Sequence, residues 1–514
     1  MNVLSGKFLL ENDPATAGKL LNLPEKVLQF GTGVLLRALP DFIIDQANRA
    51  GIFNGRIVVV KSTGQGGTDA FASQDNLYTV CVRGISGDRL ISGNVINTAV
   101  SRVLTASVQW EEILAFAESE SLEVVISNTT EVGIVPVEEN IHAGVPASFP
   151  GKLLAVLYRR YQHYKGDKSR GLVIVPTELI SDNGDKLRKI VLDLARFNGL
   201  EEDFLAWLEH HNTFCNSLVD RIVPGAPKGE LAEEIRKELD YEDALCIMSE
   251  PYALWAISGD EKVAEKLSFI QVKAGAFVEP DITRFKELKL RLLNGTHTLT
   301  CGLAYLAGFS TVKEAMNDTD FSAFLSELMF KEIVPSIPYE LSKEESEAFG
   351  KQVIDRFKNP FIEHFWINIT LNYTQKIEMR VVSLLQEYYR KNRAVPRYMA
   401  AGLAAYIRFM RPAAGVPAAG VPAAGAPAAG APAIEGEKRW YGEFNGTEYL
   451  LQDQQAAVFD TLYKGTSLVG SVLGQTEFWG TDLREIEGLE EAVTESLDIL
   501  NRHGSRYLIR QINN

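Results

Sequence analysis

The chain is poor in the residues that build disulfide frameworks and metal centres. Its 514 residues include only four cysteines and seven histidines, and neither a CxxC pair nor an HExxH motif occurs. Disulfide-rich scaffolds and zinc sites depend on such clusters, so both classes are disfavoured. We therefore expect reduced thiols in the core and no metal ion in the site.

Long apolar stretches are also lacking. The chain has no run of about 18 apolar residues, and its N-terminus carries neither the apolar core nor the cleavage pattern of a signal peptide. We therefore expect a soluble, cytoplasmic protein without membrane contact.

Positive charge is in deficit. The 52 basic residues are outnumbered by 67 acidic residues, which gives a formal net charge of −15. A field of this sign repels nucleic acid and anionic membranes, so we expect neither as a partner. A local basic pocket could still bind a small anion.

The first half of the chain alternates between strand and helix patterns. A chain of this length needs two or more domains. Short β-branched runs typical of buried strands lie at residues 26–30, 56–60, 123–127 and 171–175, and helical patterns lie at 34–50, 110–118 and 152–164. This alternation predicts a parallel sheet covered by helices on both faces.

The second half reads differently. Beyond about residue 280 the strand signals stop, and helical patterns lie at 284–293, 321–333, 343–357, 378–391, 399–410 and 485–502. We predict an α/β domain over residues 1–280 and a mostly α-helical domain over residues 281–514. Within the latter, a proline recurs at every fifth position from Pro412 to Pro432. Proline and glycine at this period disfavour helices and packed cores, so we expect a flexible loop over residues 412–433.

A glycine turn follows the first of these strands. Gly31-Thr32-Gly33 matches the start of a dinucleotide fingerprint, in which missing side chains let a pyrophosphate approach the helix N-terminus. Leu36 replaces the third glycine, and Arg37 follows one turn into the helix. After the second strand no acid occurs before Asp69, and Lys61-Ser62 could suit a 2′-phosphate. These residues leave NAD and NADP both open.

Polar residues also follow the next two predicted strands. Asn128 and Thr129 come after the strand at 123–127, and Glu178 comes shortly after the strand at 171–175. Parallel sheets bind ligands at the carboxyl ends of their strands, so these residues are candidates for a site. Turn and capping chemistry would favour the same residue types.

A third cluster, in mid-chain, combines an amine, a carboxamide and an imidazole. In a helix with about 100° per residue, His297 lies roughly 80° and Asn294 roughly 140° round from Lys289, so all three could face one cleft. Oxidation of an alcohol or reduction of a ketone needs a proton-exchanging group and donors for the developing charge. The alternative is an ordinary helix surface with a solvated lysine.

Together these segments resemble the mannitol dehydrogenase family of long-chain polyol dehydrogenases. The resemblance covers nearly the whole chain apart from the proline repeat, and the Lys-x4-Asn-x2-His cluster is the family's catalytic signature. The matching segments are residues 30–33 with 36–37, 74–79, 127–133, 178–180 with 183–185, 214–223, 289–297, 356–360 and Lys376.

The resemblance implies a Rossmann-type domain followed by a helical domain, with a metal-free, NAD-dependent site in the cleft between them. Lys289 would be the general base in oxidation and the acid in reduction, and Asn294 and His297 would polarise the reacting oxygen. The implied cofactor-binding residues are Gly31, Thr32, Gly33, Arg37, Asn128 and Thr129. The family also suggests a monomer or small oligomer.

Two departures from the polyol members bear on the substrate. Those members resemble one another in an Asp-Asn pair where this chain has Glu178-Leu179, and in an arginine where this chain has Asn368. Both changes remove groups that serve neutral polyols and agree with a hexuronate branch. We therefore expect a small hexuronate or aldonate substrate, with Glu178 and Lys376 as candidate substrate-binding residues. A polyol dehydrogenase and a non-catalytic dinucleotide-binding protein are the alternatives.

Overall fold

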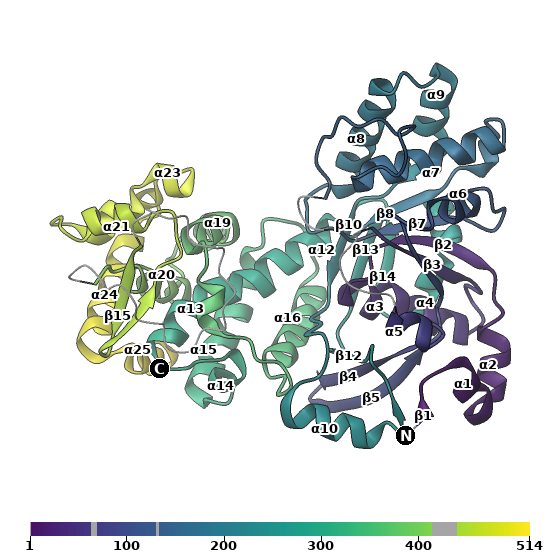
Figure 1. Cartoon of the computed structure of the whole chain (residues 1–514). Helices are drawn as coiled ribbons and strands as arrows, with labels where there is room; N and C mark the ends of the chain where they lie inside the picture. The colour runs from purple at the N-terminus through teal and green to yellow at the C-terminus, as the bar shows by residue number, and fades with distance from the viewer. Residues whose placement is uncertain (1, 63–68, 130–132, 414–438) are drawn as a thin grey trace. The chain divides into compact units, whose positions relative to one another are not determined.

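Strands and helices of the first half form one parallel sheet with helices on both faces (Figure 1). The computed structural model describes residues 2–62, 69–129, 133–413 and 439–514. Apart from its first two residues, the proline repeat predicted to be a flexible loop lies outside them. The chain divides into two units, Met1–Ile282 and Thr283–Asn514.

The main sheet of the first unit has the strand order of a dinucleotide-binding fold. Among the described residues its six strands run in the order β6-β3-β2-β7-β8-β9, all parallel. Numbered along the chain, this is the order 3-2-1-4-5-6 of the Rossmann fold, so that prediction is confirmed. The strands are β2 (Glu25–Phe30), β3 (Arg56–Lys61), β6 (Val100–Thr105), β7 (Val124–Ser127), β8 (Val173–Pro176) and β9 (Thr213–Phe214).

Alternate residues of these strands supply two hydrophobic cores. Leu28 and Phe30 of β2 pack with side chains of α6 to α9, whereas Val27 packs with α3 and α4 on the other face. Side chains of a strand alternate between faces, so a strand buried on both sides reads as a continuous apolar run. The helices are α3 (Val34–Ala38), α4 (Pro40–Arg49), α6 (Trp110–Ala117), α7 (Phe149–His163), α8 (Asn183–Phe197) and α9 (Glu202–His211).

Smaller sheets flank the main one and were not predicted. The order β12-β4-β5 joins β4 (Tyr78–Ser86), β5 (Arg89–Asn97) and β12 (Ile247–Ser249). The order β10-β13-β14 joins β10 (Ser217–Asp220), β13 (Leu254–Ser258) and β14 (Ala276–Glu279), and β1 (Asn2–Val3) pairs with β11 (Tyr241–Glu242). The remaining helices are α1 (Gly6–Asn12), α2 (Pro14–Leu20), α5 (Asp69–Ser73), α10 (Gly229–Glu238) and α11 (Glu261–Lys266).

The second unit is mostly helical and is built around α13 (Thr296–Leu306). Nearly all side chains of α13 are buried, and α20 (Arg397–Phe409) approaches it so closely that a Cβ on Gly402 would lie 2.7 Å from the Leu299 carbonyl oxygen. The other long helices are α16 (Lys343–Phe357), α19 (Val382–Asn392) and α24 (Leu489–His503). Shorter ones are α12 (Thr283–Leu288), α14 (Val312–Met316), α15 (Thr319–Glu327), α17 (Trp366–Ile369), α18 (Tyr373–Arg380), α21 (Ala456–Leu462), α22 (Leu468–Leu473), α23 (Thr476–Trp479) and α25 (Ser505–Asn513).

Three details correct the sequence analysis. The helix predicted over residues 34–50 is split, because Pro40 starts α4 and Leu39 leaves the helical region at φ −121° and ψ −78°. The helix predicted over 378–391 is likewise broken between α18 and α19. Strands do occur beyond residue 280: β15 (Tyr441–Phe444) and β16 (Thr447–Leu450) form a hairpin whose Asn445-Gly446 turn has positive φ at both residues.

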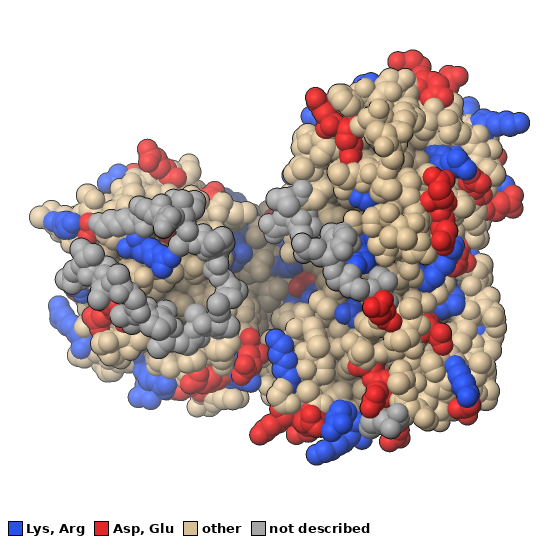
Figure 2. Space-filling view, in the orientation of Figure 1, with Lys and Arg blue, Asp and Glu red and all other residues tan. Residues whose placement is uncertain are grey.

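The surface carries charges of both signs. On the face seen in Figure 2, acidic and basic side chains of the described residues are interspersed over both units. In the described ranges, no helix combines the length and apolar character needed to cross a bilayer.

Candidate active site

The two glycines of the turn at the end of β2 have different surroundings. Gly31 has φ +125°, and a Cβ there would lie 2.9 Å from both the Asn128 carbonyl oxygen and Leu36 Cδ1, so only glycine fits. At Gly33, just before α3, an added Cβ would meet no protein atom within 4 Å. Packing therefore requires the first glycine but not the second. The open side of Gly33 fits the close approach of a dinucleotide pyrophosphate.

Leu36 explains why the third glycine of the fingerprint can be absent. Its side chain is fully buried in the core beneath α3 and α4 and contacts the turn at Gly31. The helix is thus held against the sheet by an apolar contact instead of by a glycine. Thr32 lies between the two glycines and is partly exposed.

The structure brings Asn128, Thr129 and Glu178 together at the carboxyl ends of β7 and β8. The Asn128 amide donates to the Thr177 carbonyl oxygen over 2.9 Å, and Glu178 Oε1 accepts from the Thr129 backbone N–H over 2.8 Å. Glu178 is only 2% exposed, and burial raises the pKa of its carboxyl group. Its other oxygen accepts from the Ser127 hydroxyl. Glu178 therefore ties the segment after β7 to that after β8.

Arg37 is engaged with the protein itself. Its Nη1 donates to the Leu245 carbonyl oxygen over 2.7 Å, and its guanidinium lies over the rings of Tyr78 and Phe71 at 5.4 and 5.9 Å. The hydrogen bond to Leu245 anchors α3 to the segment just before β12. Lys61, which ends β3, is buried.

In the second unit the Lys289 segment is wound as a π-helix. The helix α12 continues into η3 (Lys289–Gly295), a π-helix, and then into α13. Its backbone bonds join residues five apart, so residues at that spacing are brought onto one side, as residues four apart are in an α-helix. Lys289 and Asn294 have this spacing. The π-turn therefore aligns them better than the predicted α-helix would, and such turns are frequent at functional sites.

His297, in the first turn of α13, is 8% exposed and is surrounded by aromatic side chains. It stacks on Phe357 with ring centroids 4.0 Å apart and meets the edges of His364 and Trp366 at 5.0 and 5.9 Å. Its Nε2 is buried and has no hydrogen-bond partner in the part of the chain described. Burial, and then the positive charges around it, hold the pKa of His297 well below its usual value. The imidazole is therefore neutral, and its buried Nε2 makes no hydrogen bond to the described residues.

Two of the basic groups that lower the pKa of His297, after burial and the effects of His364 and Arg356, belong to α18. Lys376 and Arg380 lie four residues apart and so share one face of this helix. Lys376 Nζ donates to the Ile369 carbonyl oxygen over 2.8 Å, and Arg380 Nη1 donates to the Thr298 hydroxyl over 2.9 Å. Burial lowers the pKa of both groups. Together with Arg356 they make this part of an acidic protein locally positive, which favours an anionic ligand.

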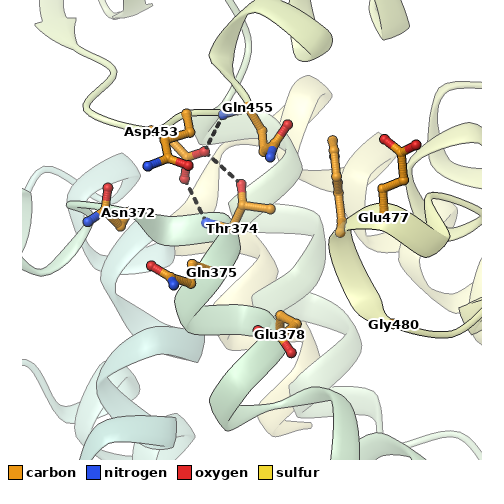
Figure 3. A pocket seen from close by; sticks show the side chains of 10 residues that line it. Asn372, Thr374, Gln375, Glu378, Asp453, Gln455, Glu477 and Gly480 are labelled. Atoms are coloured by element: carbon orange, nitrogen blue, oxygen red, sulfur yellow. Dashed lines mark hydrogen bonds between the residues drawn. The ribbon is translucent and has the colours of Figure 1, made fainter. Parts of the chain in front are cut away.

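The other face of α18 lines a different cavity. It measures about 380 Å³, and Thr374, Gln375 and Glu378 of the helix face Asp453 and Glu477 across it (Figure 3). Asp453 is held by the backbone N–H groups of Thr374 and Gln455 and by the Thr374 hydroxyl. The carboxylates here would repel an anion, so this cavity suits an anionic ligand less well than the surroundings of His297 do. Among the described residues no group of three or more His, Cys, Asp or Glu could hold a metal ion.

Comparison with known proteins places the chain in a family. Residues 25–271 match the family model of the mannitol dehydrogenase Rossmann domain, and residues 281–420 match that of the mannitol dehydrogenase C-terminal domain. The chain belongs to the mannitol dehydrogenase family. It is 36% identical over 510 residues to an altronate oxidoreductase of Halalkalibacterium halodurans, covering 96% of this chain and 94% of that protein. It is 35% identical over 489 residues to that of Bacillus subtilis, covering 95% of each.

Two solved structures share the fold. D-sorbitol dehydrogenase in substrate-free form superposes with a TM-score of 0.75 at 20% identity, covering 95% of each chain. Mannitol 2-dehydrogenase of Pseudomonas fluorescens, solved with NAD and D-mannitol, superposes with a TM-score of 0.65 at 20% identity, covering 100% of this chain and 99% of that one.

Sequence reasoning missed three residues in the surroundings of His297. Arg380 lies one helical turn after Lys376, so helical spacing could have identified it. Arg356 stands in a segment quoted for the resemblance, but without a role. His364 lies in an irregular stretch and reaches the ring of His297 only through tertiary packing, so no local signal marks it.

Proposed function

We propose that this member of the mannitol dehydrogenase family is an NAD-dependent oxidoreductase that reduces tagaturonate to altronate, reversibly, in hexuronate catabolism. Its similarity to altronate oxidoreductases extends over nearly the whole chain. A family member of the same fold has been solved with NAD. The cationic surroundings of His297 agree with a substrate that carries a carboxylate.

The observation that carries the proposal is the state of His297. A neutral imidazole with a buried, unpartnered Nε2 can donate a hydrogen bond to a substrate oxygen without giving up its proton. A group of this kind stabilises negative charge as it develops on a ketone oxygen. Stacking on Phe357 holds the ring in a fixed plane, so little reorganisation is needed when the reaction occurs.

Each unit would supply one part of the reaction. In the first unit, Gly31, Thr32 and Gly33 would bind the cofactor pyrophosphate, with Asn128, Thr129 and Arg37 around them. A bound NADH would supply the hydride that reduces the ketone carbon. In the second unit, the Lys289 ammonium would give a proton to the ketone oxygen while Asn294 and His297 donate hydrogen bonds to it. One ketone, one NADH and one proton thus become one alcohol and one NAD.

The substrate carboxylate would bind beside His297. Lys376 is our first candidate for this contact, because burial has already lowered the pKa of its amine and an incoming anion would offset that cost. Arg380 is the second candidate. Glu178, whose carboxylate already accepts from Ser127 and Thr129, would contact the substrate hydroxyl groups.

Initial rates of NADH and NADPH oxidation with tagaturonate, fructuronate and fructose test this function. Rapid oxidation of NADH with tagaturonate is the expected result. A preference for fructuronate would make the protein a fructuronate reductase, and a preference for fructose would make it a mannitol-type polyol dehydrogenase. NADH binding without turnover would indicate a non-catalytic dinucleotide-binding protein. A cytoplasmic location, a monomer or small oligomer, and a domain boundary between residues 280 and 281 stay predictions.

A further inference from the structure

A buried polar cluster lies beneath the glycine turn. Gln29 of β2, Asp41 of α4 and Tyr78 of β4 are all inaccessible to solvent, although the surrounding core is apolar. The Tyr78 hydroxyl lies 3.0 Å from Asp41 Oδ2, and Gln29 Nε2 lies 3.5 Å from the same oxygen. Burying polar groups costs folding free energy, so a buried cluster of this kind suggests a functional role.

The cluster reaches both ends of the segment that contains the turn. Gln29 Nε2 also lies 3.5 Å from the Gly31 carbonyl oxygen, and the Tyr78 hydroxyl lies 3.2 Å from the Arg37 carbonyl oxygen. The same two donors, Gln29 Nε2 and the Tyr78 hydroxyl, therefore lie near both Asp41 Oδ2 and a backbone carbonyl oxygen at one end of residues 31–37. The shared donors link the carboxyl group to the turn that would hold the cofactor.

The protonation state of Asp41 determines which group accepts the hydrogen of the Tyr78 hydroxyl. A hydroxyl has one hydrogen, so Tyr78 can donate to Asp41 or to the Arg37 carbonyl, but not to both. When Asp41 is ionised it can only accept, and it competes for the Tyr78 hydrogen. When Asp41 is neutral its own O–H can donate to the Tyr78 oxygen, which leaves the Tyr78 hydrogen for the Arg37 carbonyl. Gln29 has two amide hydrogens and can serve both acceptors in either state.

Asp41 can gain or lose a proton near neutral pH. Burial raises its pKa to about 7, against the opposing effects of the Tyr78 and Gln29 hydrogen bonds and of the Arg37 charge. Its Oδ1 has no partner in the described ranges, which also favours the neutral form. The charged groups facing the cluster are the Arg37 guanidinium, over the Tyr78 ring, and Asp45, one turn along α4 and paired with Arg49.

We propose that Asp41 is a positioning residue that couples its protonation to cofactor binding at the glycine turn. The neutral form lets Tyr78 hold the Arg37 carbonyl and leaves the turn uncharged. The ionised form withdraws that hydrogen bond and puts a negative charge beneath a site for an anionic pyrophosphate. The inference rests on the proposed binding of NAD at Gly31 to Gly33.

The test is the dissociation constant of NADH, measured by its fluorescence from pH 6 to pH 9. We expect the affinity of the wild-type protein to fall by about fivefold across neutrality, as one added charge near the phosphates predicts. Asp41→Asn should keep its pH 6 affinity up to pH 9, because the amide mimics the neutral acid. Tyr78→Phe should move the fall to higher pH, since a bond that stabilises the carboxylate is lost.

Glu332→Gln is the matched control. Glu332, in the second unit, is also buried with its pKa raised to about 7, but it accepts from the backbone N–H groups of Tyr398 and Met399. This variant should keep the wild-type pH profile. An unchanged profile in Asp41→Asn, or in Tyr78→Phe if the first variant does not fold, would overturn the inference alone. Absence of NADH binding by the wild-type protein would overturn the proposed function and this inference with it.

Discussion

The two units build their candidate sites from different material. In the first unit the site is mainly backbone: two glycines expose a turn, and Glu178, Asn128 and Arg37 are bonded to the chain around it. In the second unit the site is made of side chains, and His297 keeps a buried atom without a partner among the described residues. Backbone N–H groups suit phosphate binding, whereas proton transfer needs titratable side chains.

The contrast separates binding from chemistry. Substitutions at the glycine turn should change cofactor affinity, and substitutions around His297 should change turnover or the affinity for substrate. A substitution at the glycine turn that changed turnover alone, or one around His297 that changed cofactor affinity, would contradict this division.

The largest effect is expected at Lys289. Replacing it with alanine removes the proposed acid and base, so kcat should fall by about 10²–10⁴-fold, the usual worth of such a group. NADH affinity, measured by fluorescence titration, should stay the same. Lys351→Ala, at an exposed position of α16, is the control and should behave like the wild-type protein. Retained turnover in Lys289→Ala would assign the proton transfer to another group.

Lys376→Met should act on substrate affinity. Loss of one charge-assisted hydrogen bond to a carboxylate, worth about 1.5–3 kcal/mol, raises KM for a hexuronate by roughly 10–100-fold. Steady-state kinetics with a hexuronate and with a neutral ketose would separate this from a general loss. Glu378→Gln, on the opposite face of α18, is the control. Equal losses for charged and neutral substrates would contradict a carboxylate contact.

The two glycines of the turn form a matched pair. Gly31→Ala meets a strained φ and two atoms at 2.9 Å, so it should destabilise the protein by about 1–3 kcal/mol. Gly33→Ala meets no protein atom, so thermal melting should not change, yet NADH affinity should fall because the methyl group occupies space needed by a phosphate. If Gly33→Ala bound NADH normally, the open side of the turn would not be the pyrophosphate site.

The same division describes what the sequence could reveal. The parallel sheet and its turn were predictable because β-branched runs and glycines are local signals, and Leu36 in place of a third glycine did not hide them. The hairpin at 441–450 was missed although Asn445-Gly446 is a strong hairpin signal. The π-helix at Lys289 was not predictable, because its residues have the same apolar pattern as an α-helix. The pairing of His297 with His364 depends on packing between distant segments.

The smallest effect is a change of stability with pH that arises at His297. In the unfolded chain this histidine takes up a proton near its ordinary pKa of about 6.5, whereas the folded protein keeps it neutral. Its contribution to stability is therefore present above that pH and is lost as pH falls, by about 2 kcal/mol at pH 5. Urea unfolding at pH 7 and pH 5 should show this loss in the wild-type protein and a smaller one in His297→Phe.

The contribution of His297 must be measured as a difference between variants, because Asp41 and Glu332 change the free energy of unfolding with pH in the opposite direction. Their pKa values are raised in the folded protein, so each adds stability as pH falls towards the ordinary carboxyl range. His210→Phe, at an exposed position of α9, should keep the wild-type difference between the two pH values. If His297→Phe also kept this difference, His297 would take up its proton at the same pH in the folded and the unfolded protein, and the argument for a neutral hydrogen-bond donor to the substrate would be lost.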